Sequence, residues 1–480
     1  MISSDVSVST KGSTHVYVRC ERDRFLRPLF VVENLHELKT IDYDSVKWMD
    51  LMACGVIDFA DKEEENDFRI AKNFAELCTT IESDPSLAQY PYTHVELHGT
   101  VIAGISASLI PFAANSASAR LTFQSAMARQ AQGIHSTNDA MDRMDLSKLE
   151  MTYAQAPIVD TQMSRILHCD RFPSGQNLNV LIMSAGRAGQ EDALIANQSS
   201  VDRGACRSTS YRVLTAIEKR HGRHTLIEEF AKVDLDKCTG VKKADYTMID
   251  EADALIRLGV PTVKGTIVAQ KVLPIHGSSN AEAKLAIQSG TTQQVQHKDL
   301  SVQVQRTECG YTESVSLTTI QDGLKMANIR IAKPCLPEKG DKFSTRYGQK
   351  GTWGEKMRQE DMPCTEDGIV PDIIFNVLAF VSRMTWSQFL EALLGIICAV
   401  NGRVGNATPF STLYRDALYK TVEERVRCMK PGRIVDELSD ALVHLGFHPH
   451  GEQVMYSGKT GKRLTGRFFM APTLVQKLKH

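Results

Sequence analysis

The sequence predicts a mixed α and β protein with more than one domain, and three of its segments carry that prediction. HVYVRC, from His15, alternates in the two-residue period of a strand. LNVLIMSA, from Leu178, is a largely apolar segment of the kind that forms a buried strand. SRMTWSQFLEALLGIICAVNG, from Ser382, places apolar residues three and four positions apart, as on the buried face of a helix. At 480 residues, 42% of them hydrophobic, the chain is long enough for two or three globular domains.

Capping and turn signals predict the next elements. SARLTFQSAMARQAQG is rich in helix-forming residues, with Arg120 near its start and Gly133 as its expected C-cap. GIVPDIIFN is predicted to be a strand that follows a turn. The long apolar helix is expected to begin at a cap formed by Thr385 or Ser387 and to end at Gly402.

Two further regions are predicted to lie at the surface. The acidic run DKEEENDF, from Asp61, suits a solvated turn better than a metal site, because consecutive acids on a strand point to opposite faces. Polar stretches between Arg207 and Leu317, including the one from His276, resemble surface loops around short strands. This region is the best candidate for an inserted module.

Positive charge is concentrated in one part of the chain. The formal net charge is −1, which excludes a basic footprint over the whole chain, yet residues 325–360 hold nine Lys and Arg against four Asp and Glu. Within them, GDKFSTRYGQKGTWG spaces Lys342, Arg346 and Lys350 four residues apart among four glycines. The segment is too rich in glycine for a helix, and glycine lets a backbone approach a bulky polyanion.

An acidic pair and two arginines complete the candidate site. Glu191 and Asp192 follow a glycine turn, where they suit either the N-terminus of a helix or the binding of a divalent ion. Arg120 and Arg383 lie beside predicted helix ends. Phosphoryl transfer requires positioning and charge neutralisation more than an unusual nucleophile, so Lys, Arg and carboxylate-held Mg²⁺ together favour that chemistry.

Several other classes of site are disfavoured. SGKTGK, from Ser457, has Gln453 where a phosphate-binding loop requires its first glycine. The histidine pairs lack metal-ligand spacing and suit surface loops, and these are His221 with His224 and His448 with His450.

The cysteines and the apolar runs indicate a soluble intracellular protein. The eleven cysteines include no CxxC pair, so we expect reduced thiols and no zinc site in this chain. The start of the chain lacks the apolar core of a signal peptide, and no apolar run is long enough to span a bilayer.

The segment GDKFSTRYGQKGT closely resembles the signature of the second-largest subunit of multisubunit DNA-directed RNA polymerases, called beta in bacteria. The resemblance extends in the same order through YTHVELHGTVIAGISASLIPFAANSASARLTFQSAMARQAQG, FPSGQNLNVLIMSAGRAGQEDALIANQSSVDRG, RQEDMPCTEDGIVPDIIFN, SRMTWSQFLEALLG and VMYSGKTGKRLTGRFFMAPT. These blocks span roughly Tyr92 to His480, and the eukaryotic, archaeal and large-DNA-virus branch is more similar than the bacterial one.

The resemblance implies template-directed transfer of nucleotides from ribonucleoside triphosphates to the RNA 3′ end (EC 2.7.7.6), by a two-metal route in which the largest subunit holds most of the Mg²⁺ ligands. It places Lys342, with Lys333 or Lys339, at the RNA 3′ end, and Arg120 and Arg383 at the triphosphate. It places Glu191 and Asp192 near the second Mg²⁺. It also implies that Arg346, Lys350, Arg129 and Gln130 line the channel for the RNA–DNA hybrid.

The resemblance also implies the organisation and the partners. The expected architecture is an external-type region (1–91), a hybrid-binding domain in two pieces (92–207 and 318–480) and an inserted wall or flap module (208–317). The expected partners are the largest subunit, smaller assembly subunits, template DNA, the RNA–DNA hybrid and ribonucleoside triphosphates, with no membrane. The expected location is the nucleus, or a viral replication site or virion if the gene is viral.

Departures from the family pattern support an alternative function. Tyr347 stands where the signature has His or a small residue, Phe123 replaces a usual Tyr, and Cys335 and Pro334 occupy the positions of a second active-site lysine. Val377, Val381 and Asn406 replace two prolines and an Asp. Segments that precede and follow these blocks in the family, including a zinc-binding clamp, have no counterpart here. The alternative is a non-catalytic nucleic-acid-binding or assembly protein that retains the polymerase subunit fold.

Overall fold

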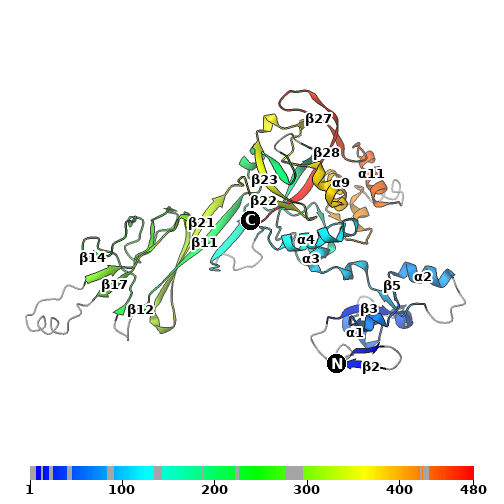
Figure 1. Ribbon diagram of the computed structural model, residues 1–480, viewed down its shortest axis with the longest axis horizontal. Coiled ribbons are helices and arrows are strands. Elements are labelled where there is room, and N and C mark those ends of the chain that lie inside the picture. Colours follow the sequence, from blue (N-terminus) through cyan, green and yellow to red (C-terminus); the bar gives the residue numbers. More distant parts are fainter. Residues whose placement is uncertain are drawn as a thin grey trace, which may run out of the picture.

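The computed structural model of the chain describes residues 7–11, 15–20, 25–39, 46–83, 91–134, 143–184, 189–221, 226–275, 296–421, 424 and 432–479. Figure 1 shows a small N-terminal part, a main part and a long arm that carries strands β11 (Ser208–Ile217) and β21 (Lys325–Cys335). The mixed α and β class is confirmed. Within the described ranges, no helix has the length and apolar character needed to cross a membrane.

The N-terminal part contains a four-stranded sheet in the order β4-β3-β6-β5 and a separate β1-β2 hairpin. Its strands are β1 (Ser7–Lys11), β2 (His15–Arg19), β3 (Arg27–Val31), β4 (Ile57–Ala60), β5 (Ile70–Ala71) and β6 (His94–Glu96). Its helices are η2 (Val32–Lys39), α1 (Trp48–Ala53), η3 (Glu64–Asn66) and α2 (Phe74–Ser83). Strand β2 confirms the prediction from His15, and the core is formed by Val32, Ala71, Leu77 and Val95.

The acidic run forms a short turn at the surface, as predicted. It contains the 3-10 helix η3, and two of its acids bind arginines: Glu63 Oε2 lies 2.7 Å from Arg19 Nη2, and Glu65 pairs with Arg27. Ion pairs within this part of the chain therefore account for part of the negative charge of the run.

The main part is built on an eight-stranded sheet in the order β22-β23-β10-β25-β9-β28-β27-β24. Its strands are β9 (Gln176–Ile182), β10 (Ala193–Asn197), β22 (Lys342–Thr345), β23 (Lys350–Met357), β24 (Cys364–Thr365), β25 (Ile373–Phe375), β27 (Glu452–Tyr456) and β28 (Arg463–Lys477). Strand β22 also pairs with β28, so six of the strands close into a ring. Closure leaves no unpaired edge in the ring, and Phe343 and Trp353 pack in its core with ring centroids 4.7 Å apart.

Helices pack around this sheet. They are η4 (Gly99–Ile102), α3 (Ile105–Ser108), η5 (Ala113–Asn115), α4 (Ser118–Ala128), α5 (Gln162–Ile166), α6 (Gln198–Asp202), η8 (Gln359–Asp361), α8 (Val377–Arg383), α9 (Trp386–Asn401), η9 (Leu413–Ala417) and α11 (Ile434–His444). The long helix α9 confirms the predicted ends: Thr385 occupies the N-cap position, without a side-chain capping hydrogen bond, Gly402 is its left-handed C-cap, and Leu394 and Ile397 are fully buried. A short parallel pair, β8 (Val159–Asp160) with β26 (Gly405–Asn406), adjoins it.

Two local predictions were wrong. Helix α4 ends with Arg129 as its C-cap rather than at Gly133, because Ala131 leaves the helix to form a bridge with Leu478. The acids Glu191 and Asp192 precede the strand β10 and not a helix, because Ile195 and Ala196 pair with β25 in the sheet.

The arm is a long antiparallel sheet in the order β15-β20-β21-β11-β7, followed by smaller sheets. Its strands are β7 (Ser147–Met151), β11, β12 (Arg220–His221), β13 (Leu226–Ile227), β14 (Cys238–Thr239), β15 (Pro261–Thr262), β16 (Ile267–Ala269), β17 (Val272–Ile275), β18 (Gln296–Asp299), β19 (Val302–Gln303), β20 (Gly310–Thr319) and β21, with η6 (Arg306–Glu308) and η7 (Gln321–Gly323). Strand β21 pairs with both β11 and β20, so the expected boundary at 317/318 divides a continuous sheet. Residues 276–295 of the expected loop region lie outside the described residues.

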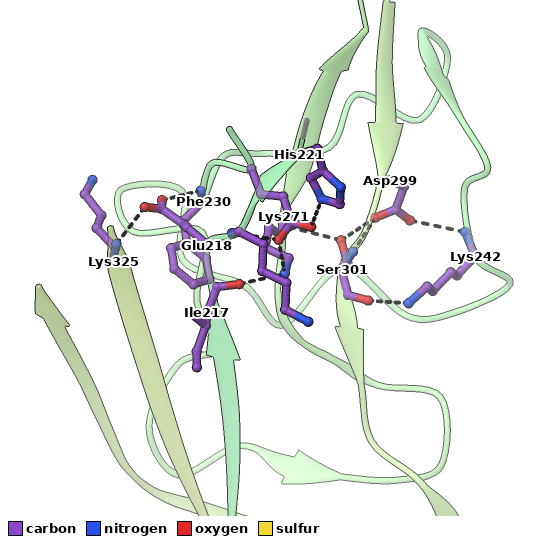
Figure 2. Close-up of polar contacts among 11 residues, drawn as sticks. Ile217, Glu218, His221, Phe230, Lys242, Lys271, Asp299, Ser301 and Lys325 are labelled. Atoms are coloured by element: carbon purple, nitrogen blue, oxygen red, sulfur yellow. Dashed lines mark hydrogen bonds and ion pairs between the residues drawn. The ribbon is translucent and has the colours of Figure 1, made fainter. Parts of the chain in front are cut away.

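A buried polar network lies where the long sheet of the arm ends and the smaller sheets begin, around the end of β11 and the start of β21 (Figure 2). The carboxylate of Glu228, only 4% exposed, accepts from Lys271 Nζ at 2.6 Å and lies 2.7 Å from His221 Nε2. Lys271 Nζ also donates to the carbonyl of Ile217 at 2.9 Å, and Glu218 accepts from the backbone N–H of Lys325 at 2.7 Å. Buried charges are tolerated here because Glu228 and Lys271 pair with each other and Glu218 accepts backbone N–H bonds.

Candidate functional site

The cationic segment from Gly340 forms a hairpin of β22 and β23. Lys342 lies opposite Thr352 in this hairpin, and directly opposed residues of an antiparallel pair share one face. Lys350, two residues before Thr352 on β23, lies on that face too, and both lysines are exposed. Lys342 and Lys350 therefore present two ammonium groups on one face of the hairpin.

The turn of this hairpin requires glycine. Gly348 has a φ of +72°, and a Cβ there would lie 2.7 Å from the carbonyl oxygen of Arg120. A Cβ on Gly351 would lie 2.8 Å from the carbonyl oxygen of Asp192. The two glycines therefore let the hairpin approach the backbones that carry Arg120 and Asp192.

Three of the predicted residues form one charged cluster beside this turn. Arg383, at the end of α8, places Nη2 2.5 Å from Asp192 Oδ1, and its Nη1 donates to Gln349 Oε1 at 2.9 Å. Arg120 Nη1 donates to the carbonyl of Gly348 at 3.3 Å. Burial lowers the pKa of Arg120, the nearby Arg383 charge lowers it further, and Asp192 acts in the opposite direction. We call Arg120, Asp192, Gln349 and Arg383 the arginine cluster.

The acidic pair has a restricted geometry. Glu191 is exposed and adopts a φ of +48°, a left-handed conformation that costs of order 1 kcal/mol for a residue other than glycine. Asp192 is bound through one carboxylate oxygen to Arg383. In the described ranges, no group of three or more His, Cys, Asp or Glu side chains is placed to hold a metal ion. The pair could therefore supply one or two ligands to an ion whose other ligands come from elsewhere.

A second cationic feature opens beside Lys342. A cavity of about 620 Å³ is lined by four lysines and two acids, which are Lys333, Lys342, Lys477, Lys479, Glu338 and Asp341. Lys477 is buried, with Nζ 3.2 Å from Asp341 Oδ2 and 3.3 Å from Ser208 Oγ. We call this feature the lysine cavity. Of the two candidates for the second active-site lysine, Lys333 lines this cavity and Lys339 does not, which favours Lys333.

The end of α4 lies at the edge of the lysine cavity. The backbone N–H of Lys479 donates to the carbonyl of Gln130 at 2.9 Å, and Gln132 lines the cavity. Arg129 and Gln130 are exposed. The structure thus brings these two residues next to the lysine that ends the described chain.

Arg346 requires a correction, because a nucleic acid could not reach it. Its side chain is 7% exposed, with Nη2 2.5 Å from Glu391 Oε1 and 2.6 Å from the carbonyl of Val159. Tyr347 is also fully buried, among Ile110 and Ala113. The four-residue spacing misled here because Arg346 lies in the turn between β22 and β23, where the alternation of a strand no longer sets the direction of a side chain. Arg346 and Tyr347 belong to the core beneath the hairpin.

Two residues that the sequence did not single out complete the site. Gln349 holds Arg383 and also donates to Thr385 Oγ1 at 2.8 Å. Lys477 holds Asp341, the neighbour of Lys342. Neither lies at a spacing that marks it in the sequence, because both act through partners distant along the chain.

Two models of known protein families match this chain. The family described as RNA polymerase Rpb2, domain 6, matches residues 106–480, and RNA polymerase Rpb2, domain 5, matches residues 48–98. The chain therefore belongs to the Rpb2 family of RNA polymerase subunits, as the sequence motifs predicted.

Individual relatives match along almost the whole chain. DNA-directed RNA polymerase II subunit RPB2 of Encephalitozoon cuniculi is 37% identical over 473 residues, which cover 97% of this chain and 38% of that protein. DNA-directed RNA polymerase II subunit 2 of Arabidopsis thaliana is 36% identical, over 97% of this chain and 37% of that protein. DNA-directed RNA polymerase subunit Rpo2 of Saccharolobus shibatae is 30% identical, over 100% of this chain and 40% of that protein. The chain spans about two fifths of the length of these relatives.

Proposed function

We propose that this chain forms one side of the active centre of a DNA-directed RNA polymerase, and that it works only in complex with the largest subunit. The observation that carries the proposal is that Lys342 and Asp192, a member of the arginine cluster, lie on opposite sides of one strand, β23. Thr352 pairs with Lys342 on one side and with Ala193, the neighbour of Asp192, on the other. Phosphoryl transfer is served by such an arrangement, in which fixed cations surround a polyanion.

The reaction assigns a task to each group. The 3′-hydroxyl of the RNA loses its proton and attacks the α-phosphorus of the incoming nucleotide, and pyrophosphate leaves. Arg120 and Arg383 bind the triphosphate, and Lys342 and Lys333 hold the RNA 3′ end. Lys350, Arg129 and Gln130 contact the backbone of the RNA–DNA hybrid without reading its sequence.

Magnesium fits this site only in a shared form. Bound Mg²⁺ would neutralise the charge that develops on the phosphates. Glu191 and Asp192 offer two carboxylates, one of them already paired with Arg383, so the largest subunit must supply the remaining ligands.

The remaining assignments follow from the same proposal. Residues 92–207 and 318–480 contribute the hybrid-binding domain, 208–317 most of the wall or flap module, and 1–91 the external-type region; the sheet β15-β20-β21-β11-β7 is shared by the module and the two flanking pieces. The partners are the largest subunit, the smaller assembly subunits, template DNA and ribonucleoside triphosphates. The place of action is the nucleus, or a viral replication site or virion for a viral gene.

The alternative of a non-catalytic assembly protein is less well supported. It was motivated by Tyr347 and by the absence of a lysine at Cys335 and Pro334. Tyr347 is buried in the core and does not face the arginine cluster, and Lys333 lines the lysine cavity with Lys342 in place of the missing lysine. It also required the charged residues to point to separate faces, whereas Arg120, Asp192 and Arg383 interact with one another.

RNA extension by the reconstituted complex tests the proposal. Lys342→Ala and Arg383→Ala should each lower kcat/KM by about 10²- to 10³-fold on a preformed hybrid, as expected for a lost charge contact in the transition state. Lys459→Ala and Arg358→Ala, which change exposed residues of the same charge outside the site, are the matched controls. Normal elongation by both site variants would refute the assignment.

A further inference from the structure

The lysine cavity contains one cysteine with an unusual setting. Cys335 ends β21, where it is half-buried and lies opposite Ser208. Lys333, two residues earlier, lies on the same face of the strand, and Cys335 Sγ is 3.5 Å from its carbonyl oxygen. Of the ten cysteines that the structure describes, Cys335 alone lines this cavity.

The charge of the cavity selects what can approach this thiol. Its lining has four lysines against two acids, and one of those acids, Asp341, is already paired with Lys477. Lys477 also reaches Ser208 Oγ, which places its ammonium group across the strand ladder from Cys335. A concave surface of one sign concentrates small molecules of the opposite sign.

A second observation indicates a ligand with a hydrogen-bond donor. Gln132 is 6% exposed and lines the cavity, and its Nε2 donates to the carbonyl of Leu478 at 3.1 Å. Its Oε1 has no hydrogen-bond partner among the described residues. A buried acceptor of this kind is normally satisfied, so an N–H or O–H donor suits the cavity.

We propose that Cys335 is a thiol-modification site at which a small anionic disulfide with amide N–H donors forms a mixed disulfide. The Cys335 sulfur loses its proton and attacks one sulfur of the disulfide. A new S–S bond forms, the original S–S bond breaks, and the departing half leaves as a thiolate that takes up a proton. The product places bulk and negative charge beside Lys342, and an external thiol reverses the reaction.

The effect on activity rests on the proposed function, because it assumes that Lys342 meets the RNA 3′ end. If so, the modified polymerase loses RNA extension and regains it after reduction. The formation of the mixed disulfide does not depend on that assumption, so the two claims can fail separately.

The test compares two disulfides of opposite charge on the reconstituted complex, with mass spectrometry at each cysteine. Glutathione disulfide is anionic and carries amide N–H groups, and cystamine is cationic. Cys335 should react with glutathione disulfide about 10-fold or more faster than Cys309 and Cys364, which are half-buried as it is. Lys333→Ala and added salt should each reduce that advantage, and cystamine should show none.

The outcomes separate the two claims. Equal rates at Cys335 for the two disulfides, or at Cys335 and Cys364 for glutathione disulfide, would overturn the thiol site. The Cys335→Ser variant should extend RNA normally and resist inhibition. Full modification of Cys335 with undiminished extension would support the thiol site and contradict the placement of Lys342 at the RNA 3′ end.

Discussion

The buried ion pair beneath the hairpin gives a prediction that separates a structural role from nucleic-acid binding. Arg346 and Glu391 are 7% and 3% exposed, and Arg346 Nη2 lies 2.5 Å from Glu391 Oε1. Burial disfavours the charged guanidinium, but Glu391 outweighs that effect and raises the pKa of Arg346. Glu391→Gln preserves the shape of the side chain and leaves Arg346 as a buried charge without its counter-ion.

Removing one partner of a buried pair costs about 3–5 kcal/mol, because the remaining charge is left uncompensated. For a part of this size that corresponds to a fall in the melting temperature on the order of 10 °C. The double variant Arg346→Met with Glu391→Leu should recover most of the loss, since apolar residues replace both charges.

Thermal unfolding followed by circular dichroism measures these shifts, with the exposed Arg358→Ala as control. RNA–DNA hybrid binding is measured on the same proteins below their melting temperatures. If Arg346→Met weakened hybrid binding while the melting temperature stayed unchanged, Arg346 would be a channel residue and the structural role would be refuted.

Three further predictions concern the arm, the hairpin turn and the lysine cavity. Burial raises the pKa of Glu228, but its bonds to Lys271 and His221 outweigh burial and hold the pKa in the folded state below 4.5. The stability that Glu228 contributes is therefore complete above about pH 4.5 and is lost as the pH falls through the folded-state pKa. Melting temperatures of the wild type and Glu228→Gln should differ at pH 7 and converge below about pH 4.5. Gly348→Ala should destabilise the hairpin by about 1–3 kcal/mol in thermal unfolding, because the backbone at this position is left-handed and the new methyl group would meet the Arg120 carbonyl. RNA extension should fall as well, and an unchanged melting temperature would contradict this. Lys477→Met should lower kcat more than it raises KM in RNA extension assays, because the ion pair from Lys477 to Asp341 positions Lys342. Lys477→Arg should restore part of the activity. A Lys477→Met protein that lost stability but kept its kinetic constants would show that Lys477 is purely structural.

Local patterns in the sequence predicted the elements whose partners are close in the chain. The three-and-four spacing from Trp386 predicted α9 with both of its ends, since a buried helical face repeats with that period. The glycines from Gly340 excluded a helix, and the segment is a hairpin with positive φ at Gly340 and Gly348. The family signature then indicated which cations belong together.

The other features of the site depend on residues far away in the sequence, and no local pattern reveals such partners. Arg346 is buried because Glu391, 45 residues later, pairs with it. Lys477 lies in the site because β28 pairs with β22, a strand far away in the sequence. Glu191 and Asp192 precede a strand because β10 pairs with β23 on one side and β25 on the other. A glycine turn in the sequence does not reveal these pairings.

Cross-linking from the RNA 3′ end tests the central claim most directly. An elongation complex that contains this chain and the largest subunit would carry RNA with an amine-reactive group at its 3′ terminus, and mass spectrometry would locate the adduct. The proposed function predicts an adduct at Lys342, with a smaller amount at Lys333, that is lost in Lys342→Ala. Adducts confined to exposed lysines outside the lysine cavity, such as Lys459 or Lys462, would contradict it.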